Sequence, residues 1–90
     1  MRFFSCLEVV LIYIQVTIDL RHYTGESFDL RLSDYYSVKK VIDIVWQIEK
    51  IKEQPREGNW VRIENKGTVL PGYASLHTNG VTNGDKIVII

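Results

Sequence analysis

The sequence is poor in the residues from which small proteins build chemical sites. Cys6 is the one cysteine among 90 residues. A single thiol cannot form an internal disulfide, and it leaves a structural zinc site or an iron–sulfur cluster without enough sulfur ligands. A reducing compartment suits such a chain. We expect Cys6 to act as a small apolar side chain.

The sequence also lacks an excess of charge of either sign. Eleven acidic and eleven basic residues give a formal net charge of zero. Phosphate backbones are bound by clustered positive charge, so nucleic acid is not an expected partner. Gly80 and Gly84 fall in predicted turns, and no glycine-rich loop of the kind that cradles phosphate is present.

No apolar run is long enough to cross a membrane. A membrane-spanning helix needs about 20 consecutive apolar residues, and Glu8, Gln15, Thr17 and Asp19 interrupt the N-terminal apolar stretch. We therefore predict that residues 1–12 form an extension ahead of a folded domain at 13–90. These residues either extend the first strand or come from a start codon assigned too far upstream. A signal peptide is the alternative, but no small-residue cleavage site follows.

Two strands and a turn are predicted first. The chain is 46% hydrophobic and long enough for one domain with a modest core. In residues 13–20 every second side chain is apolar and predicted to point inward: Ile14, Val16, Ile18 and Leu20. Phe28, Leu30 and Leu32 repeat this pattern. A short polar loop with Gly25 joins the two runs, which is typical of a β-hairpin.

A helix is predicted after the hairpin. Three residues can cap its start: Ser33, Asp34 or Ser37. Ser37 is preferred, because it places four apolar residues on one helix face: Val38, Val41, Val45 and Ile48. Ile44 and Trp46 lie at the two edges of this face. The apolar pattern fails after Ile48, so the helix is predicted to fray at 49–53, before Pro55.

Three further strands complete the predicted fold, at residues 59–64, 68–70 and 86–90. Between the last two, residues 75–77 are predicted to start a single helical turn, with Leu76 and Val81 holding the loop. Each strand has one apolar side, so one helix must cover one face of the sheet. The first and last strands are the natural parallel neighbours at its centre. The order indicates an α+β β-grasp fold with a mixed sheet of four or five strands.

Two resemblances support this fold. Residues 58–90 resemble ubiquitin in their apolar skeleton, position for position. The sequence is more similar to the YukD family, also called EsaB, in five separated segments: 17–23, 28–35, 38–44, 55–60 and 82–85. This resemblance covers roughly residues 13–90.

The YukD resemblance implies a function. That family consists of small cytoplasmic ubiquitin-like proteins of Gram-positive bacteria that belong to the type VII (WXG100, ESX-like) secretion system. They are needed for, or modulate, export of WXG100 substrates. The resemblance implies a cytoplasmic, non-catalytic accessory protein without a cofactor or metal, which docks onto protein components of the machine. These components are the cytoplasmic domains of membrane subunits or the ATPase. Self-association into a homodimer stays open, and direct membrane insertion is not expected.

The docking surface is expected to be aromatic and aliphatic, because aromatic residues and Arg are the usual interface anchors. The candidate residues are Tyr35, Lys39, Lys40, Ile44, Trp46, Arg56 and Trp60. The alternative is structural, with Trp46 and Trp60 covering the ends of a small core and Arg56 in a turn. Glu64 aligns with the central isoleucine of ubiquitin's recognition patch, so receptors for ubiquitin are not expected to bind.

Catalysis is not expected. His22 and His77 lie on different predicted loops, and no Ser, Asp and His spacing resembles a catalytic triad. A β-grasp domain can also serve other functions. A conjugated modifier or sulfur carrier needs a C-terminal glycine, where this sequence has Ile90. A small RNA-binding β-grasp module needs positive charge. The sequence does not distinguish a regulatory adaptor outside secretion from one within it.

Overall fold

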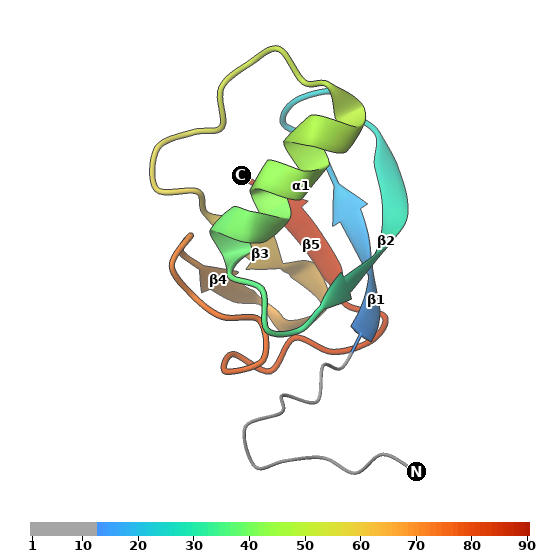
Figure 1. Cartoon of the computed structure of the whole chain (residues 1–90), viewed down its shortest axis with the longest axis vertical. Coiled ribbons are helices and arrows are strands. Elements are labelled where there is room, and N and C mark those ends of the chain that lie inside the picture. Colours follow the sequence, from blue (N-terminus) through green and yellow to red (C-terminus); the bar gives the residue numbers. More distant parts are fainter. Residues whose placement is uncertain (1–12) are drawn as a thin grey trace, which may run out of the picture.

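The computed structural model describes residues 13–90, and it confirms the β-grasp. Five strands form one mixed sheet in the order β2-β1-β5-β3-β4, with α1 across one face (Figure 1). The elements are β1 (Tyr13–Asp19), β2 (Ser27–Ser33), α1 (Val38–Glu49), β3 (Val61–Ile63), the 3₁₀ helix η1 (Glu64–Lys66), β4 (Thr68–Leu70) and β5 (Lys86–Ile89). The predicted extension at residues 1–12, including Cys6, lies outside the described residues.

The centre of the sheet is the predicted parallel pair of first and last strands. Ile18 of β1 lies opposite Ile87 of β5, and both are fully buried. The other three pairs are antiparallel. Alternating apolar side chains of β1 therefore pack under α1, where Ile42 and Val45 are also fully buried. The core lies between this helix and the sheet.

The predicted cap of α1 is confirmed. The Ser37 hydroxyl accepts a hydrogen bond from the Lys40 amide at 3.1 Å, which satisfies one of the otherwise unpaired donors of the first turn. The helix ends at Glu49, and Lys50 adopts a left-handed conformation (φ 51°). The prediction that Ile48 belongs to the buried face is wrong, because its side chain is 50% exposed. Ile48 lies in the last turn, about 70° from the centre of the buried stripe at about 100° per residue.

One further local prediction is confirmed and one changes. Residues 75–77 start the predicted single turn, since the Asn79 amide donates to the Ser75 carbonyl at 3.2 Å and the Ser75 hydroxyl accepts from the Thr78 amide at 3.4 Å. The Leu76 amide donates to Tyr36 and the His77 amide to Asp34. The chain also forms the short 3₁₀ helix η1 between β3 and β4. The third strand is shorter than 59–64, since Asn59 has a left-handed φ of 52° and Glu64 starts η1.

Candidate protein-binding surface

Tyr23, in the loop between β1 and β2, is the centre of an aromatic cluster. Its ring meets the Trp46 indole edge-on, with centroids 4.9 Å apart and planes at 81°. The Arg56 guanidinium carbon lies 5.9 Å from the centroid of the same ring, within the range of a cation–π contact. We call these three residues the Tyr23 cluster. They come from a loop, a helix and the segment between α1 and β3.

The Tyr23 hydroxyl adds two hydrogen bonds to these ring contacts. It donates to the backbone oxygen of Ile90 at 3.0 Å and accepts from the Arg56 amide at 3.1 Å. The first bond holds the residue that follows β5, and the second holds the segment after α1. One side chain therefore joins four separate parts of the fold.

The Trp46 side chain is partly buried. Its ring packs against the buried core, and its Nε1 donates to the backbone oxygen of Glu53 at 2.7 Å. This bond fixes the segment after α1 against the helix. A buried Trp needs such a partner for its N–H. The structural interpretation of Trp46, as a cover for one end of the core, agrees with this placement.

Trp60 precedes β3 and is 44% exposed. Its position depends on Gly58, which has a φ of +88°. A Cβ atom at Gly58 would lie 2.5 Å from the indole Nε1, so only glycine lets the ring approach the backbone this closely. The Trp60 carbonyl accepts from the Ile90 amide at 3.1 Å. Trp60 is therefore an exposed aromatic side chain on a well-anchored backbone.

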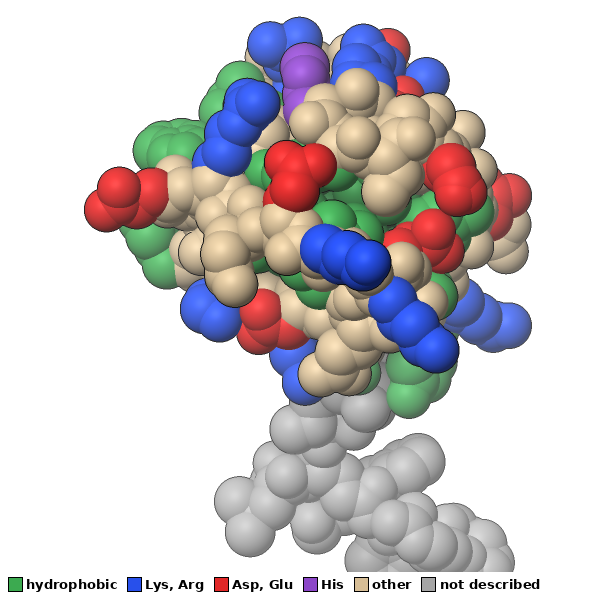
Figure 2. All heavy atoms as spheres, turned by 90° about the horizontal axis from the view of Figure 1, so that it is seen from above, with side chains coloured by type: hydrophobic (Ala, Val, Ile, Leu, Met, Phe, Trp, Pro, Cys, Tyr) green, Lys and Arg blue, Asp and Glu red, His purple; other side chains and the backbone are tan. Residues whose placement is uncertain are grey.

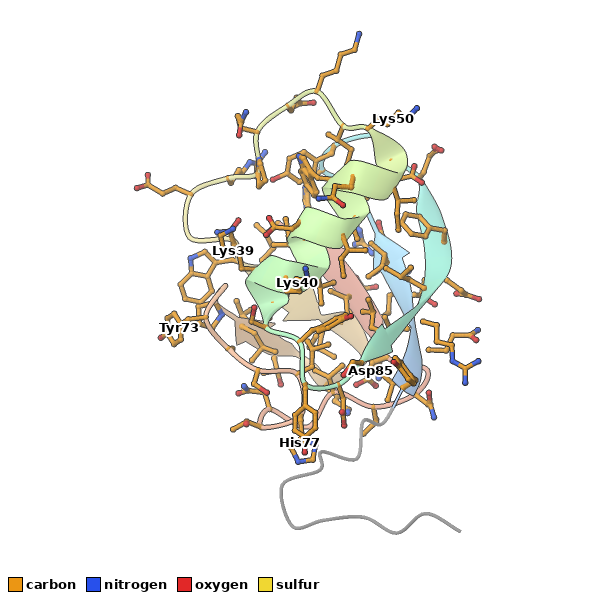
Figure 3. All side chains as sticks on the ribbon, in the orientation of Figure 1. Lys39, Lys40, Lys50, Tyr73, His77 and Asp85 are labelled. Atoms are coloured by element: carbon orange, nitrogen blue, oxygen red, sulfur yellow. The ribbon has the colours of Figure 1, made fainter. Side chains whose placement is uncertain are left out.

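The other predicted site residues lie apart from one another. Lys39 pairs with Asp43 at 3.1 Å on the side of α1 that carries Trp46. Lys40 and Ile44 lie on the opposite side of the buried stripe, and Figure 3 shows the two lysines pointing in different directions. Tyr35 is 51% exposed before α1, and its ring centroid is 5.7 Å from that of the imidazole of His77.

The structure thus brings Trp46 and Arg56 together through Tyr23, with the Trp60 backbone bonded to the same chain segment at Ile90. It does not gather Tyr35, Lys40 and Ile44 with them. The assignment of the seven predicted residues to a binding surface stays a prediction. Tyr23 was absent from the predicted set, because its hydroxyl bonds to residues 33 and 67 positions away and no local pattern signals such contacts.

A second pair that sequence reasoning missed is Asp34 and His77. The imidazole Nδ1 lies 3.1 Å from the Asp34 carboxylate, which is almost fully buried. A carboxylate that orients an imidazole is one part of a catalytic triad. Within residues 13–90, however, no hydroxyl or thiol forms a hydrogen bond with this imidazole, and no three potential metal ligands come together.

The strand ends on the sheet face opposite α1 carry paired charges. Arg21 contacts Asp19 at 2.9 Å and Glu64 at 2.6 Å, and Lys86 contacts Asp19 at 3.4 Å. The hydrogen bond from Arg21 lowers the pKa of Asp19 despite its burial. Glu64, predicted to be a charge in place of ubiquitin's apolar centre, therefore has partners. In Figure 2, seen from one end of the molecule, charges of both signs are mixed and form no single-sign patch.

A shallow, open groove of about 560 Å³ runs beside β4. Val69 and Pro71 line it together with polar side chains such as Thr78 and Asn79. Tyr73, at its border, points away from the protein and is 88% exposed (Figure 3). None of the described helices is both long and apolar enough to cross a membrane.

Two comparisons with known protein sequences identify the family. Residues 13–89 match the family described as WXG100 protein secretion system (Wss), protein YukD. A curated relative, the ESX secretion system protein YukD of Bacillus subtilis (strain 168), is 55% identical over 78 residues, which are 87% of this chain and 99% of that protein.

Solved structures confirm the ubiquitin-like fold. The ubiquitin of Caldiarchaeum subterraneum superposes with a TM-score of 0.66 at 24% identity, over 87% of this chain and 91% of the other. A ubiquitin-like domain from Arabidopsis thaliana gives 0.70 at 18% identity, over 99% and 87%. At such identities the likeness concerns the fold alone. The family match over residues 13–89 and the 55% identity carry the assignment: this chain belongs to the YukD family of the WXG100 protein secretion system.

Proposed function

We propose that this protein is an accessory component of a type VII (ESX-like) secretion system and is needed for, or modulates, export of WXG100 substrates. Family membership over residues 13–89 supports the proposal. So does the 55% identity, over almost the whole of its length, to a protein named for an ESX secretion system. The protein works in the cytoplasm, where the cytoplasmic domains of membrane subunits, or the ATPase, are its partners.

The protein acts by contact and has no catalytic activity. The observation that carries this part of the proposal is the exposed Trp60, at 44% exposure, on a backbone anchored by Gly58 and Ile90. Interface energy concentrates in a few aromatic and Arg residues. A side chain that is already held in place loses little conformational entropy on binding. The Tyr23 cluster, with the Arg56 guanidinium, supports the neighbouring backbone.

The test replaces Trp60 by Ala in a secreting strain and measures WXG100 substrates in the culture supernatant. We expect reduced export and reduced co-purification of the secretion machinery with the tagged protein. Tyr13→Ala is the matched control, because Tyr13 is an aromatic residue with 53% exposure at the start of β1, whereas Trp60 bonds to Ile90, which follows the end of the parallel strand β5. Wild-type export by a folded Trp60→Ala variant would contradict docking through Trp60.

The same strain tests docking through Trp46. Trp46→Ala removes a core contact and the Nε1 hydrogen bond to Glu53 as well as a surface. An export defect of this variant supports docking through Trp46 only if circular dichroism shows that the variant is folded. If both tryptophan variants are folded and both export normally, docking uses another surface.

We also propose that the protein works without being conjugated to other proteins. The support is the way residues 86–90 are held in the fold. β5 is the central strand of the sheet, and the Ile90 amide and carbonyl bond to Trp60 and Tyr23. Immunoblots of denatured cell extracts are expected to show one band at the mass of the free protein. A ladder of heavier covalent species would contradict this part.

A further inference from the structure

β2 is an open edge of the sheet (Figure 1). The Leu20 amide bonds to the Glu26 carbonyl, so in this antiparallel pair the backbone groups of Phe28 and Leu30 also point toward β1. Those of Asp29 and Arg31 must then point outward. Within residues 13–90 β1 is the one strand paired with β2, so no strand covers these outward groups. The edge therefore presents two consecutive sets of N–H and C=O groups.

Apart from the charges of Asp29 and Arg31, β2 carries none of the usual features that protect an edge strand. Proteins usually cover exposed edge strands, shorten them, or place Pro, Lys or a bulge in them. β2 has seven residues paired without interruption to β1, and its sequence contains neither Pro nor Lys. The opposite edge strand, β4, has three residues and is followed by Pro71. This contrast between the two edge strands indicates that another polypeptide covers the β2 edge when the protein functions.

We propose that β2 pairs antiparallel with β2 of a second copy of this chain, with Leu30 facing Leu30 across a two-fold axis. In this register Asp29 lies opposite Arg31 of the second copy, and Arg31 lies opposite its Asp29. The two residues of each pair have outward-pointing backbone groups, so each pair forms two N–H···O=C bonds. The two central residue pairs therefore contribute four backbone hydrogen bonds across the interface.

Charge selects this register over its neighbours. A shift by one pairing step places Asp29 opposite Asp29, or Arg31 opposite Arg31. Like charges directly opposite on a sheet are destabilising, whereas opposite charges stabilise the pair. The Asp29 carboxylate is already oriented on this face by the Thr17 hydroxyl, which donates to it at 2.8 Å. It retains acceptor capacity for a guanidinium, and Arg31 is exposed.

The same axis also covers apolar surface. Phe28 and Leu30 are only partly buried, since the sheet stops beside them. On the side of α1 away from the segment after it, Ile44 is partly buried and Ile48 is 50% exposed. A two-fold axis perpendicular to the sheet places both helices on one face, so these apolar side chains of the two copies border a common surface. Edge pairing alone buries less than a standard interface, and the dimer is therefore concentration-dependent.

The experiment uses the full 90-residue chain in sedimentation analysis over a range of concentrations. Asp29→Arg and Arg31→Asp each replace two attractive pairs by two repulsive ones. Each variant is expected to weaken self-association by about tenfold or more. A 1:1 mixture of the two variants, and the double variant D29R/R31D, restore opposite charges at both positions and are expected to restore dimers.

Arg62→Asp is the control, because Arg62 is exposed on β3, away from this edge. It should leave the dimerisation constant unchanged, and circular dichroism checks that every variant is folded. A second measurement follows amide hydrogen exchange of residues 29 and 31, which should slow as concentration rises. A wild-type chain that stays monomeric at every concentration overturns the proposal. So does association that neither single variant weakens, or a mixture that fails to recover dimers.

Discussion

Replacing Asp85, the residue before β5, tests a buried polar contact of the described structure. Its side chain is 3% exposed. It accepts hydrogen bonds from the Asn65 side-chain amide at 2.8 Å and the Thr82 backbone N–H at 2.9 Å, and it pairs with Lys66 at 2.8 Å. These contacts join the loop before β5 to the end of η1. Asp85→Ala removes all three at once.

The expected cost of Asp85→Ala is about 2–4 kcal/mol of unfolding free energy. A hydrogen bond to a charged group contributes about 1.5–3 kcal/mol, so three full contributions would give more. Two of the donors recover part of the loss, however. Lys66 is 37% exposed and also bonds to the Gly80 carbonyl, and Asn65 is exposed. The Thr82 N–H is the donor left to find a new partner.

The stability of the protein should also depend on the charge of Asp85. Burial raises its pKa, but hydrogen bonds from Lys66, Asn65 and Thr82 outweigh burial and bring the pKa below its ordinary value of 3.8. Asp19 has a lowered pKa too, chiefly through Arg21. A carboxyl group with a lowered folded pKa contributes stability above its unfolded pKa. That contribution is lost as the pH falls through 3.8 toward the folded pKa.

Urea unfolding, followed by tryptophan fluorescence at pH 7 and at several values between pH 5 and 2, measures both effects. Asp85→Asn keeps the shape without the charge, so it should show a weaker decline of stability with acid than the wild type. Asp43→Ala is the control, because Asp43 forms only an exposed pair with Lys39 and should cost about 0.5 kcal/mol or less. The reasoning is refuted if Asp85→Ala costs no more than this control, or if Asp85→Asn leaves the acid profile unchanged.

Three further substitutions test other contacts by the same urea unfolding. Tyr23→Phe keeps the ring but removes the hydroxyl that bonds to Ile90 and Arg56, and should cost about 1–2 kcal/mol; an unchanged midpoint would show that water replaces both bonds. Ser37→Ala removes the cap of α1 and should cost about 1 kcal/mol, with Ser37→Asp restoring stability. Ile42→Ala opens a cavity beneath α1 and should cost about 2–5 kcal/mol; a smaller loss would mean that the core collapses around it.

Local patterns in the sequence were sufficient for most elements of the fold. The alternation of Ile14, Val16 and Ile18 predicted β1, because a strand with one buried face must repeat with period two. Ser37 predicted the start of α1, because a cap involves only residues within one turn. The family resemblance rests equally on short segments matched in order, and the family match over residues 13–89 confirmed it.

Predictions failed at the ends of elements, where a local pattern continues further than the element does. Ile48 continues the apolar pattern of α1 and is half exposed in the last turn of the helix. The third strand was predicted from residue 59, but Asn59 has a left-handed φ of 52° and β3 begins at Val61. Which residues at an element's end are covered depends on the segments that pack against it in the folded chain.

The amino-acid sequence by itself determined the order of the strands and helix, the start of α1 and the family, since each depends on residue types at short spacings. Only the tertiary structure decided which candidate residues share a surface. Tyr23 joins Trp46, Arg56 and Ile90 across separations of up to 67 residues. The strand order of the assembled sheet likewise places β2 at an edge, where its backbone is exposed. Both arise from contacts between segments that become neighbours only when the chain is folded.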